Sequence, residues 1–103
     1  MYKNNLDGVE ITKRFFIAID VLRANKVIRG LKTFTRKYNI NYGNMNTLKN
    51  HSKDRILKPE YIAYLCKEYG INSNWILFGE GNIFADKFEN NLRIKQKTTT
   101  TTS

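Results

Sequence analysis

The chain of 103 residues is predicted to be all-α, and three features of the sequence support this fold class. Apolar residues recur at i, i+3 or i+4 and i+7 in several segments, which is the spacing of one buried helix face. No segment shows the sustained period-2 alternation typical of a half-buried strand. Residues that start or stop helices, such as Pro59 and Gly70, flank the periodic segments. The length allows one domain at most.

The first expected helix covers residues 11–25 and follows a loosely held polar segment at residues 1–10. Thr12 is its expected N-cap, because a side-chain oxygen at that position can accept from a backbone N–H of the first turn. Residues 26–30 break the helix, and Gly30 supplies the bend. The buried face consists of Phe15, Ile19 and Leu22.

Two short helices are expected next, over residues 31–38 and 42–50, with residues 39–41 between them. Asn41 is a suitable N-cap for the second of the pair. The inward positions are Leu31, Phe34 and Tyr38 in the first helix and Met45 and Leu48 in the second.

A fourth helix is expected over residues 59–69, where Gly70 stops it. A fifth short helix at 73–78 has Asn72 or Ser73 as its cap. The buried face of the fourth helix is formed by Ile62, Leu65, Cys66 and Tyr69.

The last segment, residues 85–103, is expected to extend beyond a domain that covers residues 11–84. Residues 85–95 are compatible with one more short helix, in which Phe88 and Leu92 share a face. The threonine run that follows is low-complexity and is expected to be disordered.

Positive charge is concentrated in one window. The net charge is +9, and residues 23–58 hold ten Lys and Arg against one acid, Asp54, whereas the segments on either side are neutral. A genome bias toward Asn, Lys and Ile would scatter lysine along the chain, but it would not remove acids from one stretch. A polyanionic partner is therefore expected, because clustered positive charge attracts phosphates.

Several classes of protein are disfavoured by the sequence. The longest apolar run has five residues, 15–19, which is too short to cross a membrane. Acidic residues precede any apolar run at the amino end, unlike a secretory signal. The single cysteine, Cys66, suits a reducing cytoplasm. No metal-ligand spacing or Gly-rich phosphate loop is present, and His51 is the only histidine. We expect no enzyme activity, no cofactor, no metal and no small-molecule ligand.

Two helices of eight or nine residues joined by a three-residue turn are typical of a helix-turn-helix. Residues 31–50 resemble the helix-turn-helix of the phage-repressor and Cro type, the lambda-repressor-like family. Apolar residues fill the five core positions of that motif, where they fix the crossing of two helices too short to be stable alone. These residues are Phe34, Tyr38, Ile40, Met45 and Leu48.

Three positions depart from the usual pattern of that family. Thr35 stands where a small residue is usual, so its hydroxyl needs a backbone partner within its own helix. Asn39 replaces the glycine of the turn, and asparagine tolerates positive φ better than most residues. Lys49 replaces an acidic residue near the end of the second helix, which removes an ion pair and adds a candidate phosphate contact.

Residues 69–84 carry a second resemblance, to the closing segment of phage-repressor DNA-binding domains. That segment has a helix-stop glycine, a capped short helix bearing Trp75, a Gly-x-Gly turn and an apolar pair. Together the two resemblances cover residues 11–84. They imply a compact five-helix lambda-repressor-like DNA-binding domain.

The resemblance assigns DNA contacts to the exposed face of the helix at 42–50, which enters the major groove in this family. Asparagine can bind adenine through two hydrogen bonds, and Thr or Tyr can contact a thymine methyl or a phosphate. Gly43 has no side chain with which to contact a base. The base-reading candidates are Tyr42, Asn44, Asn46, Thr47 and Asn50.

Cations near this helix are the candidates for contacts to DNA phosphates. Each alone is an ordinary solvated charge, but as a set they flank one helix. The set consists of Arg29, Lys32, Arg36, Lys37, Lys49, Lys53 and Arg55, with Lys58 as a further possibility.

The expected function is a sequence-specific regulator that binds double-stranded DNA in the bacterial cytoplasm. It would act as a phage or mobile-element repressor by occupying an operator. The alternatives are an RNA-binding protein or a protein-interaction module that keeps the fold without operator recognition. Aromatic residues at core positions argue against the first alternative, and the +9 charge argues against the second.

A homodimer is possible, because proteins of this type pair on half-sites about 34 Å apart. The spare apolar surface for such a contact is Phe84, Phe88 and Leu92. The same segment is equally compatible with folding back onto the core of its own chain.

Overall fold

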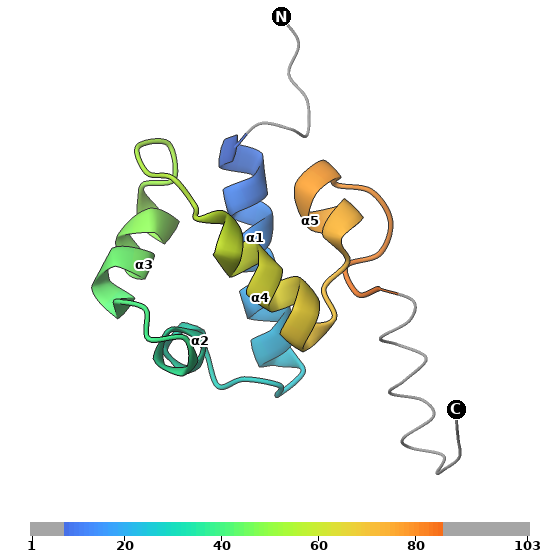
Figure 1. The fold of residues 1–103 in the computed structure, drawn as a ribbon, viewed down its shortest axis with the longest axis horizontal. Helices are drawn as coiled ribbons and strands as arrows, with labels where there is room; N and C mark the ends of the chain where they lie inside the picture. The colour runs from blue at the N-terminus through green and yellow to red at the C-terminus, as the bar shows by residue number, and fades with distance from the viewer. Residues whose placement is uncertain (1–7, 86–103) are drawn as a thin grey trace, which may run out of the picture.

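The computed structural model describes residues 8–85, which form five helices. In chain order these are α1 (Gly8–Ala24), α2 (Leu31–Lys37), α3 (Tyr42–Asn50), α4 (Pro59–Tyr69) and α5 (Ser73–Phe78). Figure 1 shows α1 and α4 in the middle of the molecule, with α2 and α3 on one side and α5 on the other. The predicted all-α class is confirmed for these residues, which contain one isolated bridge and no strand. None of their helices is long and apolar enough to span a membrane.

Helix α1 begins earlier than the sequence indicated. Residues 8–10 were expected to be loose, but they form its first turn. Thr12 is therefore not an N-cap. Its side chain is only 2% exposed, and its hydroxyl donates to the carbonyl oxygen of Gly8 over 2.9 Å. A threonine hydroxyl inside a helix can donate its hydrogen bond to the carbonyl oxygen four residues earlier, so its donor does not remain unpaired when the side chain is buried. Residues 1–7 lie outside the described part of the chain.

All five helices contribute to one core. Phe15 of α1 and Phe34 of α2 are fully buried, and their rings meet edge to face with centroids 5.6 Å apart. This geometry suits the quadrupoles of the two rings. The other fully buried large side chains include Leu22, Met45, Leu65, Ile71 and Ile76.

The turn between α2 and α3 has the predicted backbone features. Asn39 adopts a positive φ of 56°, and the side chain of Asn41 accepts a hydrogen bond from the backbone of Asn44. Thr35 is buried, and its hydroxyl donates to the carbonyl oxygen of Lys32 over 3.1 Å, as its place in the motif required. These interactions fix the chain direction between two helices that have little intrinsic stability.

The segment after α5 folds back and pairs with the residues just before α5. Gly70 ends α4 with a φ of 71°, and Asn72 caps α5. The N–H of Asn72 donates to the carbonyl oxygen of Ile83 over 2.8 Å, and Ile71 pairs with Phe84 in an antiparallel bridge. Phe84 is half-buried against the core. For Phe84 this agrees with the expected alternative in which the segment folds back onto the core of its own chain, while Phe88 and Leu92 lie outside the described residues.

Candidate nucleic-acid interface

Helix α3 separates its side chains cleanly into two faces. Met45 and Leu48 point inward and are 2% and 5% exposed. The opposite face is polar and open to solvent. Four of the five base-reading candidates are exposed on it: Tyr42, Asn44, Asn46 and Asn50.

The amino end of α3 is held by a side-chain cap. The backbone N–H of Asn44 donates to Oδ1 of Asn41 over 2.8 Å. This bond uses the backbone of Asn44 and leaves its carboxamide at the surface. A Cβ at Gly43 would lie 3.2 Å from the same oxygen, which is a tight contact. Gly43 therefore makes room for the cap, although it offers no side chain to a ligand.

Thr47 differs from its neighbours on α3. It is half-buried, and its hydroxyl donates to the carbonyl oxygen of Gly43 over 2.9 Å. Its only hydroxyl proton is thus committed to the helix backbone. Its methyl group and the two lone pairs of its hydroxyl oxygen are the parts still suited to contact a base.

Helices α2 and α3 are linked at their amino ends by a cation–π contact. The ammonium nitrogen of Lys32 lies 5.1 Å from the centroid of the Tyr42 ring. Such a contact is worth about 0.5–1 kcal/mol at an exposed site. It places a candidate phosphate contact directly beside a candidate base reader.

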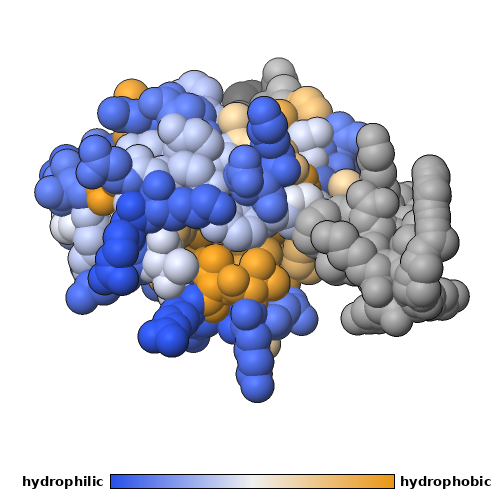
Figure 2. All heavy atoms as spheres, turned by 60° about the horizontal axis from the view of Figure 1, so that its bottom comes forward, coloured by the Kyte–Doolittle hydropathy of each residue, from blue (hydrophilic) through white to orange (hydrophobic). Residues whose placement is uncertain are grey.

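A basic hollow of about 710 Å³ lies where α1 leads into α2. The residues that line this basic hollow are Arg23, Lys26, Val27, Ile28, Arg29, Thr33 and Arg36. It has no Asp or Glu in its lining. Figure 2 brings this side forward and shows hydrophilic side chains projecting around an apolar patch. Four cations without a lining carboxylate form a strongly positive concavity.

Two members of the basic hollow were missed by the sequence prediction. Arg23 and Lys26 lie inside the acid-free window, but nothing in their spacing indicated that they would meet Arg36 of α2. The bend that brings them there includes a positive φ of 63° at Lys26. The charge window was the only signal that pointed to them.

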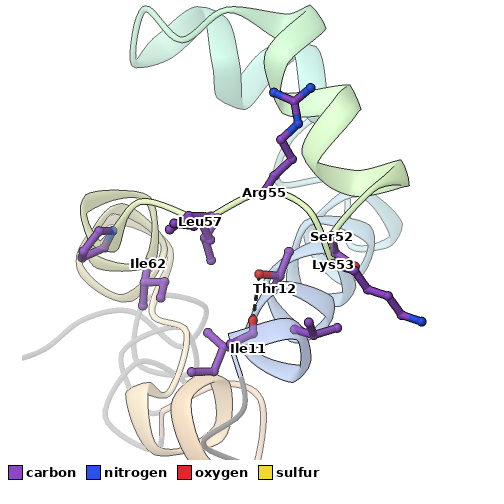
Figure 3. Close-up of a pocket in the computed structure, with 11 residues that line it drawn as sticks. Ile11, Thr12, Ser52, Lys53, Arg55, Leu57 and Ile62 are labelled. Carbon is purple, nitrogen blue, oxygen red and sulfur yellow. Dashed lines mark hydrogen bonds between the residues drawn. The ribbon is translucent and has the colours of Figure 1, made fainter.

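Cations on the other side of α3 come from the loop between α3 and α4. Arg55 and Lys58 share a hollow of about 320 Å³ with Asn44 and Tyr61. Figure 3 shows Arg55 projecting from the loop toward α3, while Lys53 projects outward. The loop thus returns beside the amino end of α3. On the same helix, Tyr42 and Asn46 share a separate hollow with Arg23 of α1.

Two of the phosphate candidates have acidic neighbours. Lys37 faces α4, where its ammonium lies 4.0 Å from Oε1 of Glu68 and 5.4 Å from the Tyr69 ring centroid. It is therefore not gathered with the cations of the basic hollow. Lys49 lines a hollow of about 200 Å³ with Asp20 of α1, Tyr42 and Asn46. Asp20 is the only carboxylate in that lining.

Comparison of the chain with models of protein families, with curated proteins and with solved structures finds no match. The face of α3 offers amides and an aromatic ring, which form hydrogen bonds and flat contacts. The Lys and Arg side chains around it are groups that can bind phosphate oxygens.

Groups suited to covalent or metal chemistry are poorly placed. Burial raises the pKa of the Cys66 thiol above its ordinary value, whereas a nucleophilic cysteine needs a lowered pKa. His51 is exposed at the end of α3. Among residues 8–85, no three His, Cys, Asp or Glu side chains gather closely enough to hold a metal ion.

Proposed function

We propose that this chain is a sequence-specific, double-stranded DNA-binding protein of the lambda-repressor-like helix-turn-helix type. Helix α3 would enter the major groove, and α2 would cross the backbone above it. The observation that carries the proposal is the placement of cations beside the exposed residues of α3. Arg23 shares a hollow with Tyr42 and Asn46. Arg55 and Lys58 share another with Asn44. A helix in the major groove lies between two phosphate backbones, so it needs positive charge on each side.

In this proposal, one set of residues contacts the base edges and another set contacts the backbone phosphates. Base edges are contacted by the exposed side chains of α3, with Asn44 as the principal reader of adenine. Backbone phosphates are contacted by the basic hollow on one side and by the loop cations on the other. Lys32 and Lys49 extend these two groups. Lys37 is left out because of its interaction with Glu68.

The biological role that fits such a domain is transcriptional regulation in the bacterial cytoplasm. Occupation of an operator blocks polymerase or a competing protein without any chemical step. The resemblance to phage repressors favours a phage or mobile element as the setting.

Recovery of bound fragments tests the proposal directly. Purified protein is incubated with sheared genomic DNA, and the retained fragments are sequenced. We expect a shared short motif, arranged as an inverted repeat if two copies bind together. If about six of these cations contact phosphates, the slope of log affinity against log salt should be about −5. A flat salt response, or retention of single-stranded DNA or RNA alone, would refute the proposal.

A further inference from the structure

Ile56 lies in the loop between α3 and α4, and its side chain is 89% exposed. In the part of the chain that the structure describes, it is the most exposed large apolar residue. A single exposed isoleucine needs no explanation by itself. The neighbours of Ile56, however, are residues to which the proposed function gives DNA contacts.

Ile56 and Asn44 line the same hollow of about 320 Å³, whose lining contains no Asp or Glu. Arg55 and Lys58 line it too, and Arg55 projects from the loop toward α3 (Figure 3). When these two cations bind backbone phosphates, they hold the loop against the duplex. Ile56 is then brought to the same part of the DNA as the carboxamide of Asn44.

An apolar side chain gains free energy when it leaves water for contact with another apolar group. In the major groove, the base edges present hydrogen-bond donors and acceptors and one large apolar group, the C5 methyl of thymine. We propose that Ile56 contacts the C5 methyl of a thymine, either in the base pair that Asn44 contacts or in the adjacent pair. Ile56 is then a specificity-determining residue outside α3. The inference rests on the proposed function.

Two other places for this side chain are open to the same test. Ile56 also lines the apolar hollow of about 340 Å³ between the loop and the starts of α1 and α4, but a side chain that is 89% exposed does not fill it. Deoxyribose offers apolar surface as well, and contact with it is the same on every sequence. The hollow that Ile56 shares with Asn44 favours the base edge over the sugar.

Deoxyuridine in place of thymidine removes only the methyl group and keeps the base pair. Each thymine of the recovered motif is replaced in turn, and affinity is measured by mobility shift. At one position, in or next to the base pair identified with Asn44→Ala, wild-type affinity should fall about three- to fivefold, the value of one buried methyl. Ile56→Ala should bind the thymine duplex more weakly than wild type does, and it should bind the thymine and deoxyuridine duplexes equally.

Ile17→Ala is the matched control. Ile17 is also exposed, at 47%, but it lines a different hollow that does not include Asn44. This variant should keep the sensitivity of wild type to deoxyuridine. Ile56→Val shortens the side chain by one methyl and should keep part of it. Ile56→Ala should retain the melting temperature of wild type, because so exposed a side chain adds little to packing.

Two results would overturn this inference. The first is an equal response of wild type and Ile56→Ala to every deoxyuridine substitution. The second is a loss of affinity in Ile56→Ala that is the same for the motif and for random duplexes, which would place the side chain on the sugar. In both cases the recovered motif and its salt dependence stand, so the proposed function survives. Absence of any salt-dependent binding to duplex DNA would instead remove both.

Discussion

Arg14 of α1 donates a hydrogen bond from Nε to the carbonyl oxygen of Ile76 in α5 over 2.7 Å, although the two residues are 62 positions apart. Its Nη2 also donates to the carbonyl oxygen of Leu77 over 3.1 Å. Arg14 is only 9% exposed. The last carbonyls of a helix lack partners within the helix, and their partial negative charge favours a cation. One buried guanidinium therefore joins the first helix to the last.

Replacing Arg14 tests this junction. Arg14→Met keeps much of the packing volume but leaves the two carbonyl oxygens without these donors. The free energy of unfolding should fall by about 2–4 kcal/mol, the cost of losing buried hydrogen bonds to a charged group. Arg14→Lys should lose less, because an ammonium can still reach one carbonyl. Urea unfolding followed by Trp75 fluorescence measures both, and an unchanged midpoint for Arg14→Met would rule out the role.

The turn between α2 and α3 gives a second prediction. Asn39 has a φ of 56°. Asn39→Ala should lower the free energy of unfolding by about 1 kcal/mol, because a Cβ without a local hydrogen bond is disfavoured in the left-handed region. Asn39→Gly should stay within about 0.5 kcal/mol of wild type. Asn50→Ala, at an exposed position of α3, is the control and should not destabilise. If Asn39→Ala and Asn50→Ala behave alike, backbone strain does not explain the choice of asparagine.

Helices α2 to α5 were predicted within one residue because their ends carry local signals. Asn41 caps α3 with its own side chain, and Gly70 ends α4 through its own left-handed backbone. Both effects depend on the residue type alone, so they can be recognised from the sequence. The helix expected over residues 85–95 lies almost entirely outside the described residues. Helix α1 was predicted three residues short because Thr12 has the residue type of a cap, while its burial decides its actual partner. Burial of that residue depends on tertiary packing, which a local pattern does not contain.

The sequence predicted most of the residue types and positions of the candidate site, but it did not predict which of these side chains lie together. The acid-free window predicted where positive charge lies, and helical periodicity predicted the exposed face of α3. Neither predicted that Arg23 and Lys26 would share a hollow with Arg36, or that Lys37 would turn toward Glu68. The role of Arg14 was also missed, because it depends on a contact across most of the chain.

Mutations in α3 should distinguish residues that contact bases from residues that contact phosphates. Asn44→Ala should cost about 1–3 kcal/mol on the recovered motif and little on random DNA, because it removes a base contact. Lys49→Ala should weaken both about equally and flatten the salt slope by about one. Lys67→Ala, which removes a charge from the exposed side of α4, is the control. Mobility-shift titrations measure all three, and identical behaviour of Asn44→Ala and Lys49→Ala would mean that α3 is not the reading helix.

The basic hollow should act as a docking site for phosphate. Arg23→Gln and Lys26→Gln remove charge while keeping much of each side chain. Each should weaken binding to every duplex by a similar factor and reduce the magnitude of the salt slope by about one. Lys67→Gln should leave both quantities near wild type. A salt slope equal to that of wild type in both hollow variants would place the phosphates elsewhere.

Tyr38 stacks on Tyr64 with ring centroids 4.0 Å apart, and its buried hydroxyl oxygen makes no hydrogen bond of good geometry among the described residues, although the Tyr69 hydroxyl lies nearby. Burial raises the pKa of Tyr38 above its ordinary value, and the neighbouring Tyr69 and Glu68 raise it further. The stacked ring contributes to packing, whereas the hydroxyl adds a desolvation cost. The two parts of this side chain thus have opposite effects on stability.

Tyr38→Phe is expected to keep the stacking and to remove the buried hydroxyl, so its melting temperature at neutral pH should equal or exceed that of wild type. The difference should grow above pH 10. There the unfolded chain loses the proton of Tyr38 at its ordinary pKa of about 10, while the folded chain retains it. The unfolded state then binds fewer protons than the native state, so the stability of wild type falls as pH rises, and this contribution is absent from the variant. Thermal unfolding between about pH 7 and pH 11 measures both effects. A loss of more than about 1 kcal/mol in Tyr38→Phe at neutral pH would show that the hydroxyl has a partner after all.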